Sequence, residues 1–465
     1  MAEFSLRRLP GPLLVRLLMM LAIGFAALVA QPAAAQSILR DAETEALFRD
    51  ISAPLIAAAG LRPEDVRIVL IHDQNVNAFV AGGQIVYIHS GLITKADNAN
   101  EVQGVIAHEL GHVVGGHIIR MQDGIRQATG ISILSLLLGV AAIAAGAGEA
   151  GAGIMAAGQQ AAMGRFLAFN RIQESSADQA GASFLSRAGV SGRGSLAFFE
   201  KLQNLEFRYA VPQEDSYART HPLNRERIAA LENVYQTDPA WERQTPAALE
   251  ERFQRVRAKL AGYVEEPQRV LDRYPASNRS VPARYARAYA WHRAAHPDRA
   301  LAEAESLLAD HPNDPFFLEL KGQILLESGR PAEALAALRE AVERSRSEPL
   351  IASVYGHALI ATEDPAHYPE AERVLRTVVQ RDQQNPFAWY QLGIVYDRAG
   401  DLGRASLATA ERYSLTNEPR MAMVSAQQAM AGIPTGTPDW IRAQDILMVS
   451  RAEIERDGER NRGRR

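Results

Sequence analysis

Apolar positions recur with two different spacings in the first half of the chain. The runs Val66–His72 and Gln84–His89 are short and rich in Val and Ile, which predicts two strands with a turn at 82–83 between them. After Asn98 the apolar residues change to a helical spacing, and Asn98 with Glu101 forms a candidate capping box at the start of that helix. Residues 36–265 therefore read as one mixed domain, helical for the most part and with a small sheet.

The second half of the chain repeats with a period of about 34 residues. Prolines at 282, 315, 349, 386 and 419 are spaced by 33, 34, 37 and 33 residues, and glycines at 322, 356 and 393 each follow a proline by seven. Trp389, Leu392, Gly393 and Tyr396 reproduce the W-x2-L-G-x2-Y pattern of tetratricopeptide repeats. We therefore expect an all-α repeat solenoid over residues 266–450, and the fold class as a whole is α+β.

Residues 127–164 are apolar in an unusual way, because Glu149 is their one charged residue. The stretch Ile131–Ala145 could pass for a short membrane helix, but the glycines within and after it weaken it as a stable span. We favour a helical hairpin that covers the active site or touches a membrane surface. A transmembrane pair is the alternative, and it would make the protein an integral membrane protease.

The two ends of the chain differ from the rest. Three arginines precede the apolar run Leu17–Ala30, and small residues at 33–35 offer a cleavage site, which predicts a secretory signal peptide over residues 1–35. An uncleaved membrane anchor is the alternative. Residues 451–465 are mostly arginine and acid, and we expect a charged disordered tail.

Composition limits the chemistry. The formal charge is −4, which argues against nucleic acid as a partner. The 465 residues contain no cysteine, so a metal ion would have to be bound through nitrogen and oxygen.

The sequence His108-Glu109-Leu110-Gly111-His112 is the strongest sign of chemistry. Histidines four apart on a helix face the same way and can bind one zinc ion, while Glu109 is placed to act as a base on a zinc-bound water. His117 is nine residues after His108, one short of the spacing of metzincins, and is rejected as the third ligand. Glu174 is the better third ligand, with Asp178 one turn later to accept a hydrogen bond from a ligand histidine. These residues predict a zinc hydrolase of the zincin type, in which the strand at 84–89 would pair with an extended peptide.

With these residues in place, the chain resembles the H-E-x-x-H zinc peptidases of the BepA (YfgC)-like and HtpX types. The matching pieces are 77–79 with 82–83, 91–92, 108–112 with His117, 174–178, and Thr220-His221-Pro222 with Arg227, together with the signal peptide and the repeats. The resemblance implies that His221 can fill the fourth coordination position of the metal and keep the enzyme inactive. It also implies that Arg227 stabilises the oxyanion of the tetrahedral intermediate. Without the resemblance, His221 would be read as an ordinary turn residue and Arg227 as an ordinary helix residue.

The resemblance implies a periplasmic endopeptidase, peripheral to the outer membrane, that degrades unfolded or stalled envelope polypeptides. Its repeats would dock clients or the outer-membrane protein assembly machinery. A chaperone-like assembly factor with secondary proteolysis is the competing function, since a concave helical solenoid suits the holding of clients. The motifs alone do not rank these two functions.

Overall fold

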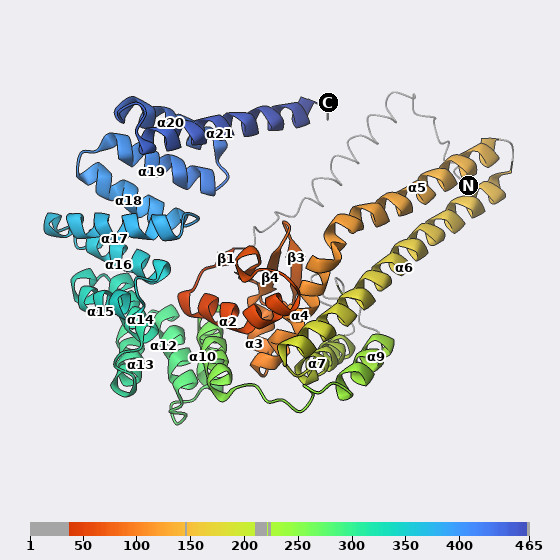
Figure 1. Cartoon of the computed structure of the whole chain (residues 1–465), viewed down its shortest axis with the longest axis horizontal. Coiled ribbons are helices and arrows are strands. Elements are labelled where there is room, and N and C mark those ends of the chain that lie inside the picture. Colours follow the sequence, from red (N-terminus) through yellow and green to blue (C-terminus); the bar gives the residue numbers. More distant parts are fainter. Residues whose placement is uncertain (1–36, 145–146, 210–220, 222–224, 463–465) are drawn as a thin grey trace, which may run out of the picture. The chain divides into compact units, whose positions relative to one another are not determined.

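The computed structural model describes residues 37–144, 147–209, 221 and 225–462 (Figure 1). The predicted signal peptide and its cleavage site lie outside the described residues. The strands are β1 (Ile38–Leu39), β2 (Arg67–Ile71), β3 (Ala78–Ala81) and β4 (Ile85–His89), and they form one sheet in the order β1-β2-β4-β3.

The two predicted strands are present as β2 and β4, but the connection between them differs from the prediction. β2 and β4 are parallel, with Val69 opposite Tyr87, and parallel neighbours need a long crossover rather than a two-residue turn. The turn at Gly82 and Gly83, both with positive φ, instead joins β4 to the antiparallel strand β3, which was not predicted. β4 is thus an interior strand, and the expectation that strand 84–89 pairs with substrate is wrong. β3 lies at the edge of the sheet.

Helices enclose this sheet and bury the core of the first domain. They are α2 (Ala42–Ala58), α3 (Ser90–Lys95), α4 (Ala99–Gly115), α6 (Gly148–Ala188), α7 (Arg193–Tyr209), α9 (Arg225–Gln236) and α10 (Ala247–Val264). α4 lies at the centre of the core, and Val102 and Ile106 are fully buried. Its N-terminus is capped by Asn98, whose side chain accepts a hydrogen bond from the Glu101 amide, while the Glu101 carboxylate accepts one from the Asp97 amide.

The apolar segment 127–164 belongs to a hairpin of two long helices, as predicted. α5 (His117–Ala144) begins just after α4, and α6 returns alongside it before entering the first domain (Figure 1). Gly116, with a φ of +62°, ends α4 and lets the chain turn into α5. α5 is long and apolar enough to cross a membrane by length and composition.

The repeats fold as paired helices, which confirms the predicted tetratricopeptide architecture. The helices are α11 (Pro267–Arg273), α12 (Val281–Arg293), α13 (Pro297–Asp310), α14 (Pro315–Glu327), α15 (Pro331–Arg344), α16 (Pro349–Ala361), α17 (Tyr368–Arg381), α18 (Pro386–Arg398), α19 (Leu402–Leu415), α20 (Pro419–Gly432) and α21 (Pro438–Arg462). The recurring glycine permits close packing within a pair: a Cβ at Gly322 would lie 2.3 Å from Leu338. The recurring proline stands in the first turn, where its missing N–H leaves no hydrogen bond unmade.

α10 connects the two halves, because it packs on both. Val256 and Leu260 join the core of the first domain, while Ala258 packs against Ala286 of α12. The expected domain boundary at 265/266 therefore lies just after a helix that packs against both domains.

A buried set of charged residues, the junction cluster, lies at this contact. Its members are Asp41, Glu43, Arg255, Lys259 and Tyr285. Lys259 Nζ lies 2.5 Å from Asp41 Oδ1, Arg255 Nη2 lies 2.8 Å from Glu43 Oε1, and the Tyr285 hydroxyl donates to Glu43 Oε2 over 2.8 Å. The cluster ties the start of α2 to α10 and α12.

The end of the chain differs from the expected disordered tail. Residues 451–462 continue α21 as helix. The reason is local: this stretch is rich in arginine and glutamate, which favour helix even where the side chains are exposed.

Candidate metal centre

α4 presents two histidines to one point. His108 and His112 are one turn apart, and their Nε2 atoms lie 3.1 Å from each other. The side chains are buried, with 3% and 9% of their surface exposed. Such a short separation between two ring nitrogens is favourable only when a cation, or a proton, lies between them.

α6 brings Glu174 to the same point. It can approach because residue 111 is glycine: a Cβ there would lie 2.6 Å from the Ala177 carbonyl oxygen. Glu174 Oε2 lies 3.4 Å from His108 Nε2, and Glu174 Oε1 lies 3.4 Å from His112 Nε2. The separation of 66 residues between His108 and Glu174 is thus closed by one helix-to-helix contact.

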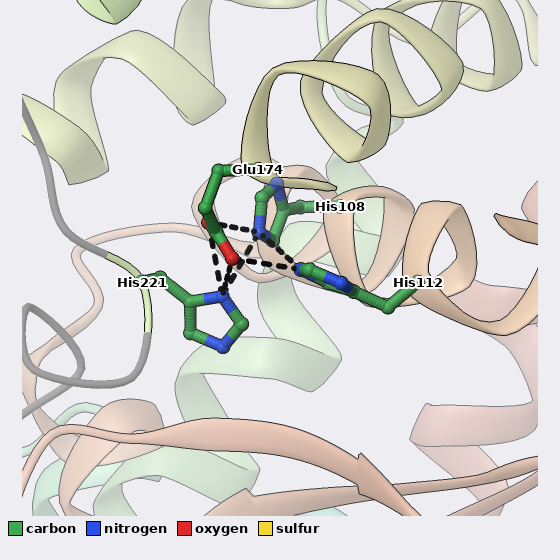
Figure 2. Close-up of side chains that lie close together, drawn as sticks. All are labelled: His108, His112, Glu174 and His221. Carbon is green, nitrogen blue, oxygen red and sulfur yellow. Dashed lines mark hydrogen bonds and ion pairs between the residues drawn. The ribbon is translucent and has the colours of Figure 1, made fainter. Parts of the chain in front are cut away.

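His221 completes the group from a position just before α9. Its Nδ1 lies 3.1 Å from Glu174 Oε1 and 3.2 Å from His108 Nε2. Figure 2 shows the four side chains pointing toward one another, with Glu174 and the three imidazoles around a shared centre.

The four donor atoms fit a zinc ion. All lie within 4.8 Å of one another, and the separations given above are 3.1–3.4 Å. Four ligands at ordinary zinc bond lengths in a tetrahedron would be ~3.4 Å apart. Three imidazole nitrogens and one carboxylate oxygen are also a donor set that suits zinc.

Behind the donors, Asp178 and Arg227 form a buried support. Asp178 Oδ1 lies 2.9 Å from His108 Nδ1, so the ring can donate through Nδ1 and present Nε2 to the metal. Arg227 donates to both Asp178 oxygens, over 2.7 and 2.8 Å, and its third nitrogen lies 3.1 Å from Glu174. Burial alone would raise the pKa of Asp178, but the hydrogen bonds from Arg227 and His108 hold it below its usual value.

Glu109 differs from its neighbours because its charge is not compensated by a hydrogen bond. It is fully buried, and neither carboxylate oxygen has a hydrogen-bond partner among the described residues. Burial raises its pKa, although His221 and His108 oppose the shift. Glu109 Oε1 lies 3.4 Å from His221 Nε2, on the side of that ring away from the donor group.

Two residues near the centre were not predicted to take part. His117 Nδ1 lies 2.9 Å from His112 Nδ1, so the first residue of α5 can fix the orientation of the second histidine. Phe199 of α7 stands edge-on to the His108 ring, at 6.2 Å between centroids, with Arg227 over its face. The pair of glycines before His117 is the sequence signal for the first, since a Cβ at Gly115 would lie 2.2 Å from the His117 ring. No local pattern singles out Phe199.

Comparison with known proteins agrees with this chemistry. Residues 39–235 match Peptidase family M48. The chain is 26% identical to a Beta-barrel assembly-enhancing protease from Yersinia pestis over 83% of this chain and 79% of that protein. It is 27% identical to the protein of the same name from Escherichia coli K12, over 79% of this chain and 75% of that protein.

A solved structure is also similar to part of this chain. YrrB, a tetratricopeptide-repeat protein, is similar over 38% of this chain and 91% of its own, with 20% identity and a TM-score of 0.32. The matched domain, the relatives' activity and the convergent histidines and carboxylate agree with one another. Over residues 39–235 the chain is thus similar to Peptidase family M48, and the chain is a metalloendopeptidase.

Proposed function

We propose that this protein is a zinc-dependent endopeptidase of the periplasm that degrades misfolded or stalled outer-membrane and other envelope proteins. The observation that carries the proposal is the convergence of four buried donor atoms beside a buried, unbonded glutamate. The Beta-barrel assembly-enhancing proteases to which the chain is similar support the substrate class. The predicted signal peptide supports the location.

His108, His112 and Glu174 would hold the zinc ion, and His221 would be the fourth, exchangeable ligand. A bound zinc ion supplies Lewis-acid chemistry, since it polarises a carbonyl and lowers the pKa of water to ~7. The support behind the ligands keeps them in place: Asp178 orients the ring of His108, and Arg227 clamps Asp178 to Glu174.

Glu109 would be the general base. It would take a proton from the water that attacks the scissile carbonyl and pass that proton to the leaving amine. A carboxylate suits both steps, because it accepts a proton as the base and gives it up again as the acid. The Glu109 oxygens have no hydrogen-bond partner within the described residues, so they could accept one from water once His221 moves away.

Arg227 takes a different role in this proposal from the oxyanion contact that the resemblance implied. All three of its guanidinium nitrogens lie against carboxylate oxygens of Asp178 or Glu174. We therefore assign Arg227 to positioning the ligands, and the oxyanion contact stays a prediction.

The substrate would bind to the outer edge of β3. β4 is paired on both sides, whereas no strand pairs with the far side of β3 in the part of the chain that the structure describes. A peptide added there would be held mainly through its backbone, which implies a loose sequence preference and favours unfolded polypeptide. A groove of ≈ 1020 Å³ between the start of the first domain and the repeats, lined by residues such as Arg67 and Asp382, supports docking of a longer client.

One observation favours a second function, that of a chaperone-like assembly factor. His221 lies among the donor atoms and also against Glu109, so the resting site would be closed to water on two counts. A protein in this state could hold clients on its repeats without cutting them.

Trapping tests the proposal and separates the two functions. The Glu109→Gln variant is expressed in the native host, and bound proteins are identified by mass spectrometry. A protease that acts on stalled envelope proteins should accumulate them uncleaved in this variant, while the wild type shows fragments. Equal recovery of intact clients with both proteins, and no fragments with either, would support the assembly factor and contradict the protease.

A further inference from the structure

The hairpin of α5 and α6 carries its large apolar residues on the outside. Among residues 127–164, α5 exposes seven large aliphatic side chains, each 45–63% accessible: Ile133, Leu134, Leu136, Leu137, Leu138, Val140 and Ile143. In a water-soluble hairpin such residues would lie between the helices.

Small residues bring the two helices close together, with Met155 and part of Ile143 packed against them. A Cβ added at Gly139 would lie 2.4 Å from Met155 and 2.8 Å from the Gly151 carbonyl oxygen, and one at Gly158 would lie 2.0 Å from Ser135. The Ser135 hydroxyl donates to the Ser132 carbonyl of its own helix, so it needs no partner outside. Close contacts through small residues, with aliphatic side chains facing outward, are the packing of helices that lie in lipid.

The two helices are not alike on their outer faces. In the same segment α6 exposes two large apolar side chains, Ile154 and Met163, and it also exposes the amides of Gln159 and Gln160. Amides in the hydrocarbon layer without partners are costly, which argues against a hairpin that crosses the bilayer. The asymmetry suits a hairpin that lies flat, with α5 toward the lipid and α6 toward water.

Charge is confined to the base of the hairpin, apart from Glu149. The exposed arginines 120, 126, 165 and 171 stand there with one exposed acid, Asp123, which lies 3.5 Å from Arg126, so this group is positive overall. Arg165 Nη2 donates to Gln127 across the two helices at 3.4 Å. Arg126 is 79% exposed and lies seven residues before Ile133, on the same face of α5. A cationic group beside an apolar face complements the anionic headgroups and acyl chains of a membrane surface.

We propose that the outer face of α5 docks the protein onto an anionic lipid bilayer, in the plane of the interface and without crossing it. The inference concerns a surface outside the metal centre and holds whether or not the proposed proteolysis is correct. Docking would place the nearby peptidase domain against the membrane where envelope proteins are inserted.

Vesicle binding tests the proposal. The metal-loaded protein, with the signal segment removed, is floated with vesicles of phosphatidylethanolamine and phosphatidylglycerol. We expect Leu137→Glu to lower vesicle affinity roughly tenfold, because a charge enters the lipid-facing surface. Gln160→Glu adds the same charge on α6 and should leave affinity within about twofold of wild type. Circular dichroism and bound zinc confirm that both variants fold.

A fluorescent reporter gives the orientation. In Leu137→Trp, the added tryptophan should shift to shorter emission wavelengths on binding vesicles and be quenched by brominated lipid, and in Gln160→Trp it should not. Equal shifts in both variants would indicate a crossing pair and overturn flat docking. Absent vesicle binding by wild type, or a Leu137→Glu variant that binds as wild type does, would overturn lipid contact. So would a Leu137→Glu variant that binds vesicles normally and only changes the oligomeric state.

Discussion

The junction cluster and the metal centre are two groups of charged residues that differ in how their charges are paired. In the junction cluster each charge has an opposite charge beside it: Lys259 faces Asp41 and Arg255 faces Glu43. In the metal centre three histidines and Glu174 converge on one point, and Glu109 beside them has no hydrogen bond among the described residues. The first group pairs its charges within the chain, whereas the second offers donor atoms that could bind a cation from outside the chain.

The pKa values follow this difference. Burial would lower the pKa of Lys259, but Asp41 and its neighbours hold it well above the usual value, so the pair stays charged. Burial also raises the pKa of Glu109, which for a carboxyl group favours the neutral form, and His221 and His108 oppose that shift without cancelling it. Buried charges in close pairs hold the fold together, whereas a buried carboxyl group without a hydrogen bond is a candidate for catalysis.

Replacement of Glu109 should produce the largest change in activity. Glu109→Gln keeps the shape of the side chain and removes the base, so turnover of an unfolded substrate should fall about a hundredfold or more. Bound zinc, measured by mass spectrometry, should stay near wild type because Glu109 is not a ligand. Glu226→Gln, an exposed change on α9, is the control. Turnover above a few per cent of wild type would remove Glu109 from the role of base.

Removal of a ligand should affect the metal first. Glu174→Ala deletes the one carboxylate of the donor set, and zinc affinity should fall by roughly a hundredfold, with activity following it. Dialysis against a competing chelator gives the affinity. A Glu174→Ala protein that keeps its zinc under the same conditions would mean that another residue is the third protein ligand.

A change in the junction cluster should lower stability and leave zinc binding unaffected. Lys259→Met leaves Asp41 without its cation, whereas Glu43 keeps Arg255, so we expect a loss of about 3 kcal/mol in the free energy of unfolding. Zinc affinity of the folded variant should not change. Arg62→Met, which breaks a pair whose arginine is 72% exposed, should cost under about 0.5 kcal/mol. Chemical denaturation measures both, and an equal loss in the two variants would contradict the comparison.

The smallest expected effect concerns the inhibition of the metal centre by His221. His221→Ala opens the fourth position of the metal and frees Glu109 from the ring 3.4 Å away, so cleavage of casein should rise several-fold with zinc retained. Self-cleavage is expected with it. Unchanged or lower cleavage, at equal zinc content, would make His221 a structural or catalytic residue and not a restraint.

Sequence patterns predicted what lies within single helices. The spacing of His108 and His112, and of Glu174 and Asp178, follows from the helical period, and the repeats follow from recurring proline and glycine. What the sequence could not show depends on contacts between distant segments. β3 is four residues long and was hidden beside a predicted turn, so β4 was wrongly taken as the strand that binds substrate. The packing of α10 against both the first domain and the repeats depends on which helix faces meet. A periodic pattern shows only that a helix has an apolar face, not what that face contacts.

The contact between His117 and His112 links the hairpin to the metal centre. α5 has 28 residues, so it is ~42 Å long, and its first residue is one hydrogen bond from the metal centre. The orientation of the His112 ring is therefore coupled to the start of α5 through this one hydrogen bond. The helix that we propose to dock on lipid thus begins in contact with a residue of the metal centre.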